Sequence, residues 1–218
     1  MRRTMIAATG NPEKMVEIRQ ILASSDIDLI TMKDAGIDVE IVENGSTFEE
    51  NALLKARAVA HSSGKMAIAD DSGLVVDAMG GEPGIHSARW MGHDTSYDIK
   101  NREIIRLVDE YCAREGIIQK NVHPGCGPDG TPGPLRSARF VCAVAVVWPD
   151  GKERTATGVL EGRIGTEQRG TNGFGYDPIF FLPEYGKTSG EIPREEKNRI
   201  SHRGQAFRKI RDILEEES

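Results

Sequence analysis

The sequence predicts an α/β protein with a mixed sheet, divided into two lobes around a cleft. Strand and helix patterns alternate in the first part of the chain, as parallel strands joined by helices require. An antiparallel hairpin pattern follows near residue 150. The chain has 218 residues, which is long enough for one large domain or for two modest lobes.

The first expected element is a buried strand over residues 4–8, and a helix follows from Pro12. Asn11 is the expected N-cap, and Pro12 takes the first helical position, where its missing N–H is not needed. One face of this helix carries Met15, Ile18 and Leu22. A second strand is expected over residues 27–32.

A capping box, in which Glu50 follows Thr47 by three residues, predicts the start of a second helix. Its expected stripe is Leu54, Ala58 and His61, and Gly64 ends it. Strands are then predicted over residues 66–70 and 74–78, on either side of an acidic turn.

The second half of the chain alternates less regularly. A long helix is expected over residues 95–115, with a stripe made by Ile104, Val108 and Tyr111. A Gly/Pro-rich loop covers residues 124–134. Residues 140–148 and 153–160 flank Pro149-Asp150-Gly151 and predict the hairpin. One more strand covers residues 179–182, and a last helix follows His202 with Phe207, Ile210 and Leu214 on one face.

Composition excludes several classes of protein. The net charge of −6 argues against binding to a nucleic-acid backbone, which leaves a basic footprint on a domain. No apolar run is long enough for a membrane span or a signal peptide, so we expect no membrane partner and a cytoplasmic location. The spacing of Cys112, Cys126 and Cys142 favours neither a disulfide framework nor a zinc site.

Three polar clusters, over residues 9–14, 69–73 and 201–204, indicate a site for a phosphorylated small molecule. The first cluster closes an apolar run and opens a helix, so backbone N–H groups and Lys14 can face an anion. It lacks the Walker A pattern, which argues against a kinase or a motor ATPase. Clusters of this kind converge on one cleft more readily than on three unrelated surfaces, which favours an enzyme.

The acidic pair Asp70 and Asp71 is expected to divide two roles, because adjacent strand residues point to opposite faces. Asp71 is the better candidate for holding Mg²⁺ or accepting a proton from water. An acid that caps the turn explains the pattern equally well. Glu43 is a candidate second oxygen ligand, although alone it fits an exposed strand-end glutamate better. Lys55, like most lysines, is equally compatible with a solvated position.

Residues 171–178 interleave glycines with Phe174 and Tyr176, which would let an aromatic face lie against a planar base. The alternative is a glycine-rich bend that packs both aromatics into the core. The third cluster supplies donors suited to a purine carbonyl oxygen and to phosphate. His202 is otherwise a residue at a helix N-terminus without a ligand.

These residues carry a resemblance to a known family. The chain resembles the inosine/xanthosine triphosphate pyrophosphatases, also called the Ham1-like family, nearly from end to end. The motifs that carry the resemblance are Ala8 to Asn11, Thr47 to Ala52 with Lys55, Ala69 to Leu74, Pro83 to Arg89, Phe174 to Pro178 and Ser201 to Gly204. It implies one domain over residues 1–218, with an elongated central sheet, flanking helices and two lobes.

The resemblance implies Mg²⁺-dependent hydrolysis of ITP, dITP and XTP to the monophosphate and pyrophosphate, and a homodimer. It makes Asp71 the general base and a metal ligand, with Glu43 as the second metal ligand. It assigns substrate contacts to Thr9, Gly10, Asn11, Pro12, Glu13, Lys14, Lys55, Ser72, Phe174, Gly175, Tyr176, Asp177, Lys197, His202 and Arg203. Of these, Thr9 to Lys14 would cradle the triphosphate, while His202 and Arg203 would read the six-position oxygen of the purine.

Such a reader would leave its donors unpaired against the amino group of adenine. Guanine also carries the six-position oxygen, so exclusion of GTP must depend on its two-position amino group. The chain departs from the family at residues 120–136, whose Gly/Pro-rich run is longer than usual and could be a lid, a dimer contact or bare surface. Trp90 also stands where a smaller aromatic is common.

Two other classes of function remain. A nucleotide-binding regulatory module would keep the phosphate cradle and would not need Asp71 and Glu43. A different metal-dependent phosphohydrolase, acting on standard dNTPs or on a sugar phosphate, would keep the acids. It would release orthophosphate or show no preference for purines with a six-position oxygen.

Overall fold

The computed structural model describes residues 3–23, 26–116 and 122–216. The chain divides into two compact units. Unit 1 comprises residues 1–72, 141–159 and 198–218, and unit 2 comprises residues 73–140 and 160–197. Two units agree with the two lobes predicted from the sequence, whereas the cleft stays a prediction.

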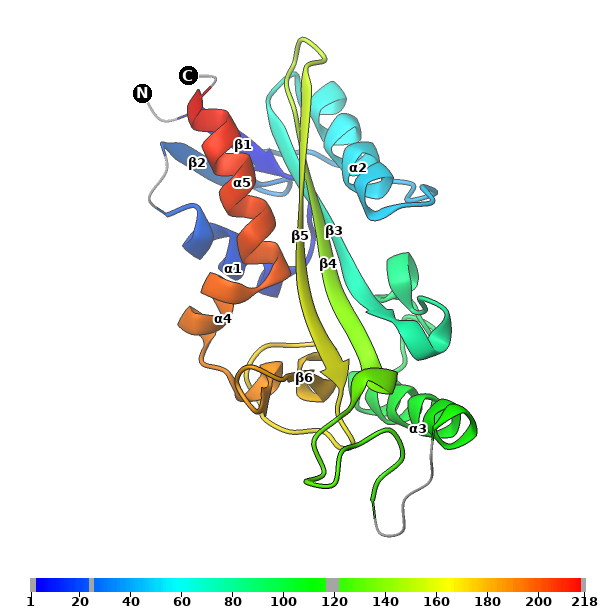
Figure 1. Ribbon diagram of the computed structural model, residues 1–218. Coiled ribbons are helices and arrows are strands. Elements are labelled where there is room, and N and C mark those ends of the chain that lie inside the picture. The colour runs from blue at the N-terminus through cyan, green and yellow to red at the C-terminus, as the bar shows by residue number, and fades with distance from the viewer. Residues whose placement is uncertain (1–2, 24–25, 117–121, 217–218) are drawn as a thin grey trace. The chain divides into compact units, whose positions relative to one another are not determined.

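The described residues form a mixed seven-stranded sheet with the strand order β2-β1-β3-β4-β5-β6-β7 (Figure 1). The strands are β1 (Arg3–Ala7), β2 (Ile27–Thr31), β3 (Ala67–Val76), β4 (Ser137–Val147), β5 (Glu153–Ile164), β6 (Phe180–Leu182) and β7 (Lys187–Thr188). β1 pairs in parallel with β2 and β3, whereas β6 pairs in antiparallel fashion with β5 and β7. The predicted mixture of parallel and antiparallel pairing is confirmed.

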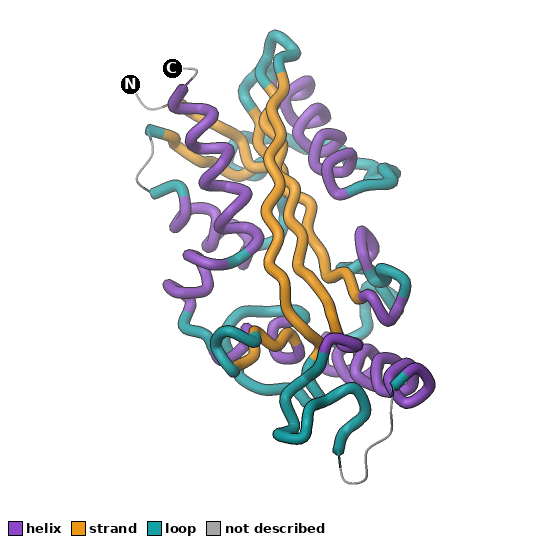
Figure 2. Tube along the Cα trace, in the orientation of Figure 1, coloured by secondary structure: helices purple, strands orange, loops and turns teal. Residues whose placement is uncertain are grey.

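Five α-helices accompany the sheet in the described part of the chain (Figure 2). They are α1 (Pro12–Ile21), α2 (Phe48–Ser63), α3 (Tyr97–Glu115), α4 (Arg194–Ile200) and α5 (His202–Glu216). No described helix is both long enough and apolar enough to cross a membrane.

Strand β3 is buried on both faces within unit 1. Ile68 of β3 packs in a cluster with Ile18 of α1 and Phe207 of α5. Its neighbour Ala69 packs in a second cluster with alanines of α2. Figure 1 shows α1 and α5 on one side of β3 and α2 on the other. Alternate residues of β3 therefore face α1 and α5 on one side and α2 on the other.

The predicted turn at Asp70 and Asp71 is wrong, because β3 runs without interruption from Ala67 to Val76. Both carboxylates are nearly fully buried within the strand, at 2% and 7% exposure. A strand can keep two adjacent acids in its interior because each meets a cation from a different neighbouring helix, Lys14 of α1 or Lys55 of α2.

The helix boundaries follow the predicted caps. Asn11 Oδ1 accepts hydrogen bonds from the N–H groups of Glu13 and Lys14, and Thr47 Oγ1 accepts one from Glu50 N–H. Gly64 ends α2 in the left-handed conformation, with φ of 62°. These caps are confirmed because they depend on contacts within a few residues. The return bond of the predicted capping box differs, since Glu50 Oε2 accepts from Ser46 N–H, one residue before Thr47.

The predicted stripe of α2 is wrong. His61 is exposed and Leu54 and Ala58 are half-buried. The buried residues are Asn51, Ala52, Lys55, Ala56, Val59 and Ala60. Small side chains let the helix lie close to the sheet, and the two polar residues meet buried partners, so bulk hydrophobicity does not mark the inner face.

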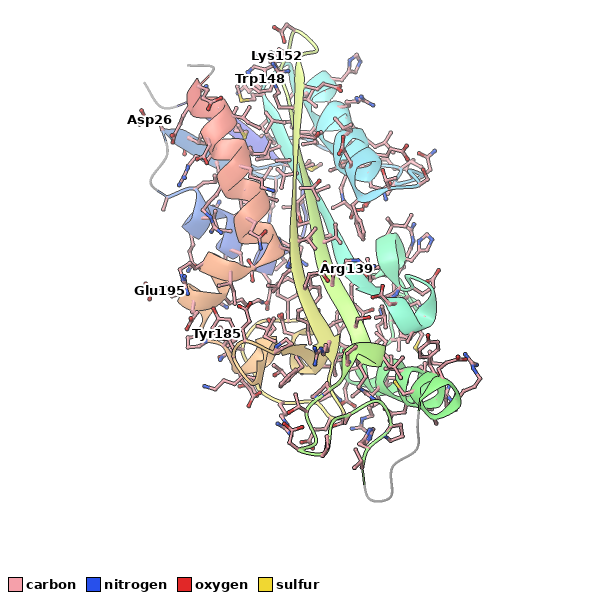
Figure 3. All side chains as sticks on the ribbon, viewed as in Figure 1. Asp26, Arg139, Trp148, Lys152, Tyr185 and Glu195 are labelled. Carbon is pink, nitrogen blue, oxygen red and sulfur yellow. The ribbon has the colours of Figure 1, made fainter. Side chains whose placement is uncertain are left out.

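In α3, Ile104 and Val108 are buried as predicted, whereas Cys112 replaces the half-buried Tyr111 in the stripe. The hairpin is confirmed, and Gly151 N–H donates to the carbonyl of Trp148 at its tip. Lys152 Nζ lies 5.2 Å from the centroid of the Trp148 ring in the same tip (Figure 3).

The last helix is confirmed as α5, and its predicted face of Phe207, Ile210 and Leu214 is buried. The short elements α4 and β7 were not predicted. Of the Gly/Pro-rich run 120–136, residues 120–121 lie outside the described residues. The described part of this run is held by Arg136, which is fully buried and donates to Asp109 and to the carbonyl of Pro124.

Candidate active site

Asp70 anchors one face of β3 in unit 1. Its Oδ2 lies 2.9 Å from Lys14 Nζ and 3.5 Å from Arg203 Nε, and it accepts a hydrogen bond of 3.3 Å from Ser72 Oγ. Lys14 comes from α1 and Arg203 from α5, so the first and third polar clusters meet at the second one. The convergence predicted for these clusters is present within unit 1.

Charge controls the ionisation of Asp70. Burial raises the pKa of this carboxyl, but the charges of Lys14, Arg203 and Lys55 outweigh burial and bring the pKa well below its usual value. Arg203 also donates to Glu17 and, at 2.9 Å, to Ser72 Oγ. Asp70 is therefore an anion that holds two cationic side chains in place.

Arg203 and His202 are both buried at the start of α5, at 3% and 7% exposure. The guanidinium of Arg203 lies among Glu17, Asp70 and Ser72. Both side chains are more buried than we expected for residues that contact the purine base. Recognition of the six-position oxygen by His202 and Arg203 stays a prediction.

The loop before α1 is built by short-range hydrogen bonds. Asn11 N–H donates to Thr9 Oγ1 at 3.2 Å, while Asn11 Oδ1 accepts from Glu13 N–H at 2.9 Å. A Cβ at Gly10 would meet no atom within 4 Å, so the space immediately beside Gly10 is open. The loop is ordered by its own contacts and has room beside it for a ligand.

Asp71 lies on the other face of β3, toward α2. Its Oδ1 is 3.3 Å from Lys55 Nζ, and the same ammonium is 2.9 Å from Glu43 Oε2. Asp71 Oδ2 accepts a hydrogen bond of 3.2 Å from Asn51 Nδ2. Asp71 and Glu43, which the resemblance pairs as metal ligands, thus lie in one cluster with Lys55.

Asp71 and Lys55 shift each other's pKa, and burial shifts the pKa of both. Burial raises the pKa of Asp71, and the charges of Lys55 and Lys14 offset that effect only in part. Burial lowers the pKa of Lys55, but the charges of Asp71, Asp70 and Glu43 outweigh it and raise the pKa above its usual value. Lys55 stays protonated at neutral pH, while Asp71 is a stronger base than an ordinary aspartate.

The cluster around Lys55 suits a hard divalent cation. No group of three or more His, Cys, Asp or Glu side chains positioned to hold a metal occurs among the described residues. Glu43 and Asp71 supply two carboxylates that already converge on one cation, the ammonium of Lys55. Mg²⁺ is commonly held by one or two carboxylates together with water and substrate phosphates, so this donor set fits it.

Unit 2 brings together the residues predicted for base binding. Asp177 Oδ2 accepts from Phe174 N–H at 2.8 Å and from Lys197 Nζ at 2.7 Å, and Asp177 Oδ1 accepts from Ser189 Oγ at 2.8 Å. Lys197 Nζ lies 5.4 Å from the centroid of the Phe174 ring. Asp177 is 3% exposed, so its carboxylate orders this loop.

Gly173 is required by this packing. Its φ is +79°, and a Cβ there would lie 2.1 Å from Asp177 Oδ2 and 2.6 Å from Lys197 Nζ. The glycine therefore lets the bend close over the carboxylate.

The two aromatics of the bend differ. Phe174 is half-buried, whereas Tyr176 is 4% exposed. The Tyr176 hydroxyl donates to the carbonyl of Ser87 at 2.7 Å, and its ring meets Tyr97 edge to face, with centroids 5.1 Å apart. Packing into the core, the alternative interpretation, therefore applies to Tyr176, and Phe174 keeps the accessible face. Gly175 lies beside Tyr97, and its carbonyl accepts from Asn101 Nδ2.

Sequence reasoning gave no role to Asn51, Glu17 or Ser189. Asn51 stands four residues before Lys55 in α2, so the two share one helix face, and that spacing was a usable signal. Glu17 and Ser189 carry no comparable signal, because their partners Arg203 and Asp177 are distant in the sequence.

Proteins of known family resemble this chain in both sequence and fold. A dITP/XTP pyrophosphatase of Listeria monocytogenes is 45% identical over 214 residues, which is 97% of this chain and 95% of the relative. A HAM1 protein from Coxiella burnetii matches the fold with a TM-score of 0.81 and 33% identity, over 98% of this chain and 99% of that chain. The Ham1 protein of Staphylococcus aureus matches with a TM-score of 0.80 and 34% identity, over 99% of this chain and 100% of that chain.

The Ham1 family model matches residues 5–122 and 128–213. These ranges include Lys14, Asp70 and Arg203 on one face of β3, and Asp71 with its partners on the other. Sequence, fold and the clustering of these side chains agree, and the chain belongs to the Ham1 family.

Proposed function

We propose that this protein hydrolyses ITP, dITP and XTP to the nucleoside monophosphate and pyrophosphate, and so removes non-standard purine nucleotides from the cellular pool. The observation that carries the proposal is the cluster of Asp71, Lys55 and Glu43, in which a buried carboxylate with a raised pKa lies beside a lysine and a second acid. The name of the Listeria monocytogenes relative, 45% identical over nearly the whole chain, supports the choice of substrate.

Asp71 is the proposed general base. A water molecule attacking the α-phosphorus must lose a proton, and a carboxylate more basic than an ordinary aspartate accepts it more readily. Asn51 and Lys55 restrict the orientation of the carboxylate, so it need not reorganise to receive the proton.

Glu43 and Asp71 would hold Mg²⁺. When bound, the ion would neutralise negative charge on the triphosphate oxygens. Lys55, which lies between both carboxylates, would turn to the phosphates and add a second positive charge. Lys14 and the residues from Thr9 to Glu13 would contact the phosphates at the start of α1, where the helix dipole favours an anion.

In unit 2, Phe174, Gly175 and Lys197 are assigned to base recognition, while the buried Tyr176 and Asp177 hold the bend from within. In unit 1, the resemblance assigns the purine oxygen to His202 and Arg203. Phe174 would stack on the purine, because its ring is only half-buried. Asp177 would act by holding the Phe174 amide and Lys197, since its carboxylate is already paired with both. Ser72, bound to Asp70 and Arg203, would contact the substrate through its hydroxyl.

The product test uses ITP, XTP, GTP and ATP in equal amounts with Mg²⁺. We expect monophosphate and pyrophosphate from ITP and XTP, with little turnover of ATP and GTP. Release of orthophosphate, or equal turnover of all four nucleotides, would favour a different metal-dependent phosphohydrolase. Binding of ITP without turnover would favour a nucleotide-binding regulatory module.

A homodimer and a cytoplasmic location belong to the same proposal, and both rest on the resemblance and on the substrate. Light scattering of the purified protein tests the dimer, which predicts a mass twice the 23.9 kDa of one chain.

The dependence on Mg²⁺ has its own test. Removal of Mg²⁺ with a chelator should abolish pyrophosphate release, and added Mg²⁺ should restore it.

A further inference from the structure

Asn51 lies inside the cluster that joins Glu43, Lys55 and Asp71, and it is 1% exposed in the first part of α2. We propose that Asn51 is a positioning residue that fixes the Asp71 carboxylate relative to the loop carrying Glu43, and so sets the geometry of the cation site. This inference rests on the proposed function, because it concerns the residues assigned to Mg²⁺.

Asn51 joins two separate parts of unit 1 through one amide group. Its Oδ1 accepts a hydrogen bond of 2.9 Å from Gly45 N–H, and its Nδ2 donates one of 3.2 Å to Asp71 Oδ2. A backbone N–H can only donate and a carboxylate can only accept, so both partners require the same orientation of the amide. The side chain thus has one arrangement that satisfies both neighbours.

Gly45 fits closely against Asn51. A Cβ on Gly45 would lie 2.8 Å from Asn51 Oδ1 and 2.8 Å from Glu50 Cβ. The loop backbone therefore packs against α2 at a distance that only glycine permits. Since Gly45 follows Glu43 by two residues, this contact also limits where the Glu43 carboxylate can lie.

The two oxygens of Asp71 have different partners. Oδ2 is held by Asn51, whereas Oδ1 is held by Lys55, which also binds Glu43. A cation between Glu43 and Asp71 would compete with Lys55 for the same oxygens, but it would leave the Asn51 bond in place. The cation would therefore displace the contact between Lys55 and Asp71, whereas the hydrogen bond between Asn51 and Asp71 would persist.

The two partners of Asp71 would therefore have different roles. Lys55 gives way to the cation, and Asn51 keeps the Asp71 carboxylate in its orientation. Without a second holder, Asp71 would be free to rotate once Lys55 turned away, and the site would lose its geometry when the cation arrived. Groups that hold metal ligands from behind in this way typically change metal affinity or activity about 10–100-fold when they are removed.

The test measures cation binding directly, with Mn²⁺ alone as the probe and electron paramagnetic resonance as the readout. Asn51→Leu removes both hydrogen bonds and keeps the number and branching of the side-chain heavy atoms. Gly45→Ala disturbs the loop contact while keeping the amide. Ala60→Gly is the matched control, because Ala60 is a buried residue in the last part of α2, and glycine there weakens the helix without removing either Asn51 hydrogen bond.

We expect Asn51→Leu to weaken Mn²⁺ binding on the order of 10–100-fold. The Mg²⁺ concentration needed for half-maximal pyrophosphate release from ITP should rise in parallel, with KM for ITP at saturating Mg²⁺ little changed. Gly45→Ala should weaken Mn²⁺ binding in the same direction. Ala60→Gly should lower the melting temperature and leave Mn²⁺ affinity at the wild-type value.

Wild-type Mn²⁺ affinity in Asn51→Leu, together with a lowered melting temperature, would overturn the inference and leave Asn51 a structural residue. If Asn51→Leu does not fold, wild-type affinity in Gly45→Ala overturns it equally. If the wild-type protein binds no Mn²⁺ and needs no Mg²⁺, the proposed metal site fails, and the inference fails with it. If the wild-type protein binds Mn²⁺ and needs Mg²⁺, but both variants bind Mn²⁺ with the wild-type affinity, the inference fails and the proposed function stands.

Discussion

Replacing Asp70 by asparagine should destabilise the protein strongly, although the substitution changes one atom. The Asp70 side chain is 0% exposed and lies between Lys14 and Arg203, so the variant leaves two positive groups without their shared anion. Removing one partner of a buried ion pair costs about 3–5 kcal/mol. Lys14 keeps 17% side-chain exposure and Arg203 keeps Glu17, which places the expected loss near the lower end, at about 3 kcal/mol.

The same prediction has a definite pH dependence. The pKa of Asp70 in the folded protein is depressed, so its ionisation stabilises the fold above the unfolded-state pKa of about 3.9. That contribution is lost as the pH falls below this value toward the folded-state pKa. The difference in unfolding free energy between wild type and Asp70→Asn should therefore be constant from pH 7 to 5 and should shrink below about pH 4.

Urea unfolding followed by circular dichroism, at several pH values, measures this difference. At neutral pH the variant should also melt roughly 6–12 °C lower, given about 2–4 °C per kcal/mol for a chain of this size. Asp98→Asn is the control, because Asp98 is 55% exposed and its pair with Arg102 is worth less than about 1 kcal/mol. A loss below about 1 kcal/mol in Asp70→Asn, or a difference independent of pH, would refute the reasoning.

Three further predictions concern Gly173 and Tyr176 in unit 2 and Lys55 in unit 1. Gly173→Ala should raise KM for ITP severalfold with a smaller effect on kcat, because a Cβ there would displace Asp177, and an unchanged KM in steady-state assays would count against it. Tyr176→Phe should lower the unfolding free energy by about 1 kcal/mol, measured in urea, through loss of the bond to a buried carbonyl, while an equally stable variant would contradict that contact. Lys55→Met should move the acidic limb of the pH–rate profile to higher pH, because the Lys55 charge lowers the pKa of Asp71; a limb that stays in place would show that another group controls it.

Local features of the fold could be predicted from the sequence because their causes are local. Asn11 and Thr47 cap helices through bonds to amides two or three residues away, and Gly64 ends α2 through its own backbone angle. The hairpin around Gly151 follows from the same kind of short-range preference. Such signals are complete within one short window of sequence.

The interior of β3 could not be predicted in this way. Two adjacent acids look like a turn, and a buried carboxylate at Asp70 is acceptable only because Lys14 and Arg203, both distant in the sequence, lie beside it. The inner face of α2 was missed for a related reason, since Asn51 and Lys55 are buried by virtue of Gly45, Glu43 and Asp71. Polar residues buried by distant partners carry no hydrophobic signal of their own.

The candidate site was predicted mainly by resemblance. Residue types alone left Asp71 open between catalysis and the capping of a turn, and Glu43 between metal binding and an exposed strand end. The structure brings both to Lys55. Tyr176 shows the limit of transferring roles by motif, because its hydroxyl is already bound to a core carbonyl.

The most direct test of the central claim is to measure pyrophosphate release from ITP and ITP binding in the same preparation of Asp71→Asn, with Mg²⁺ present. Loss of the general base should lower kcat about 10²–10⁴-fold while ITP still binds within severalfold of wild type. Turnover within severalfold of wild type would contradict the assignment of Asp71 as the residue that activates water.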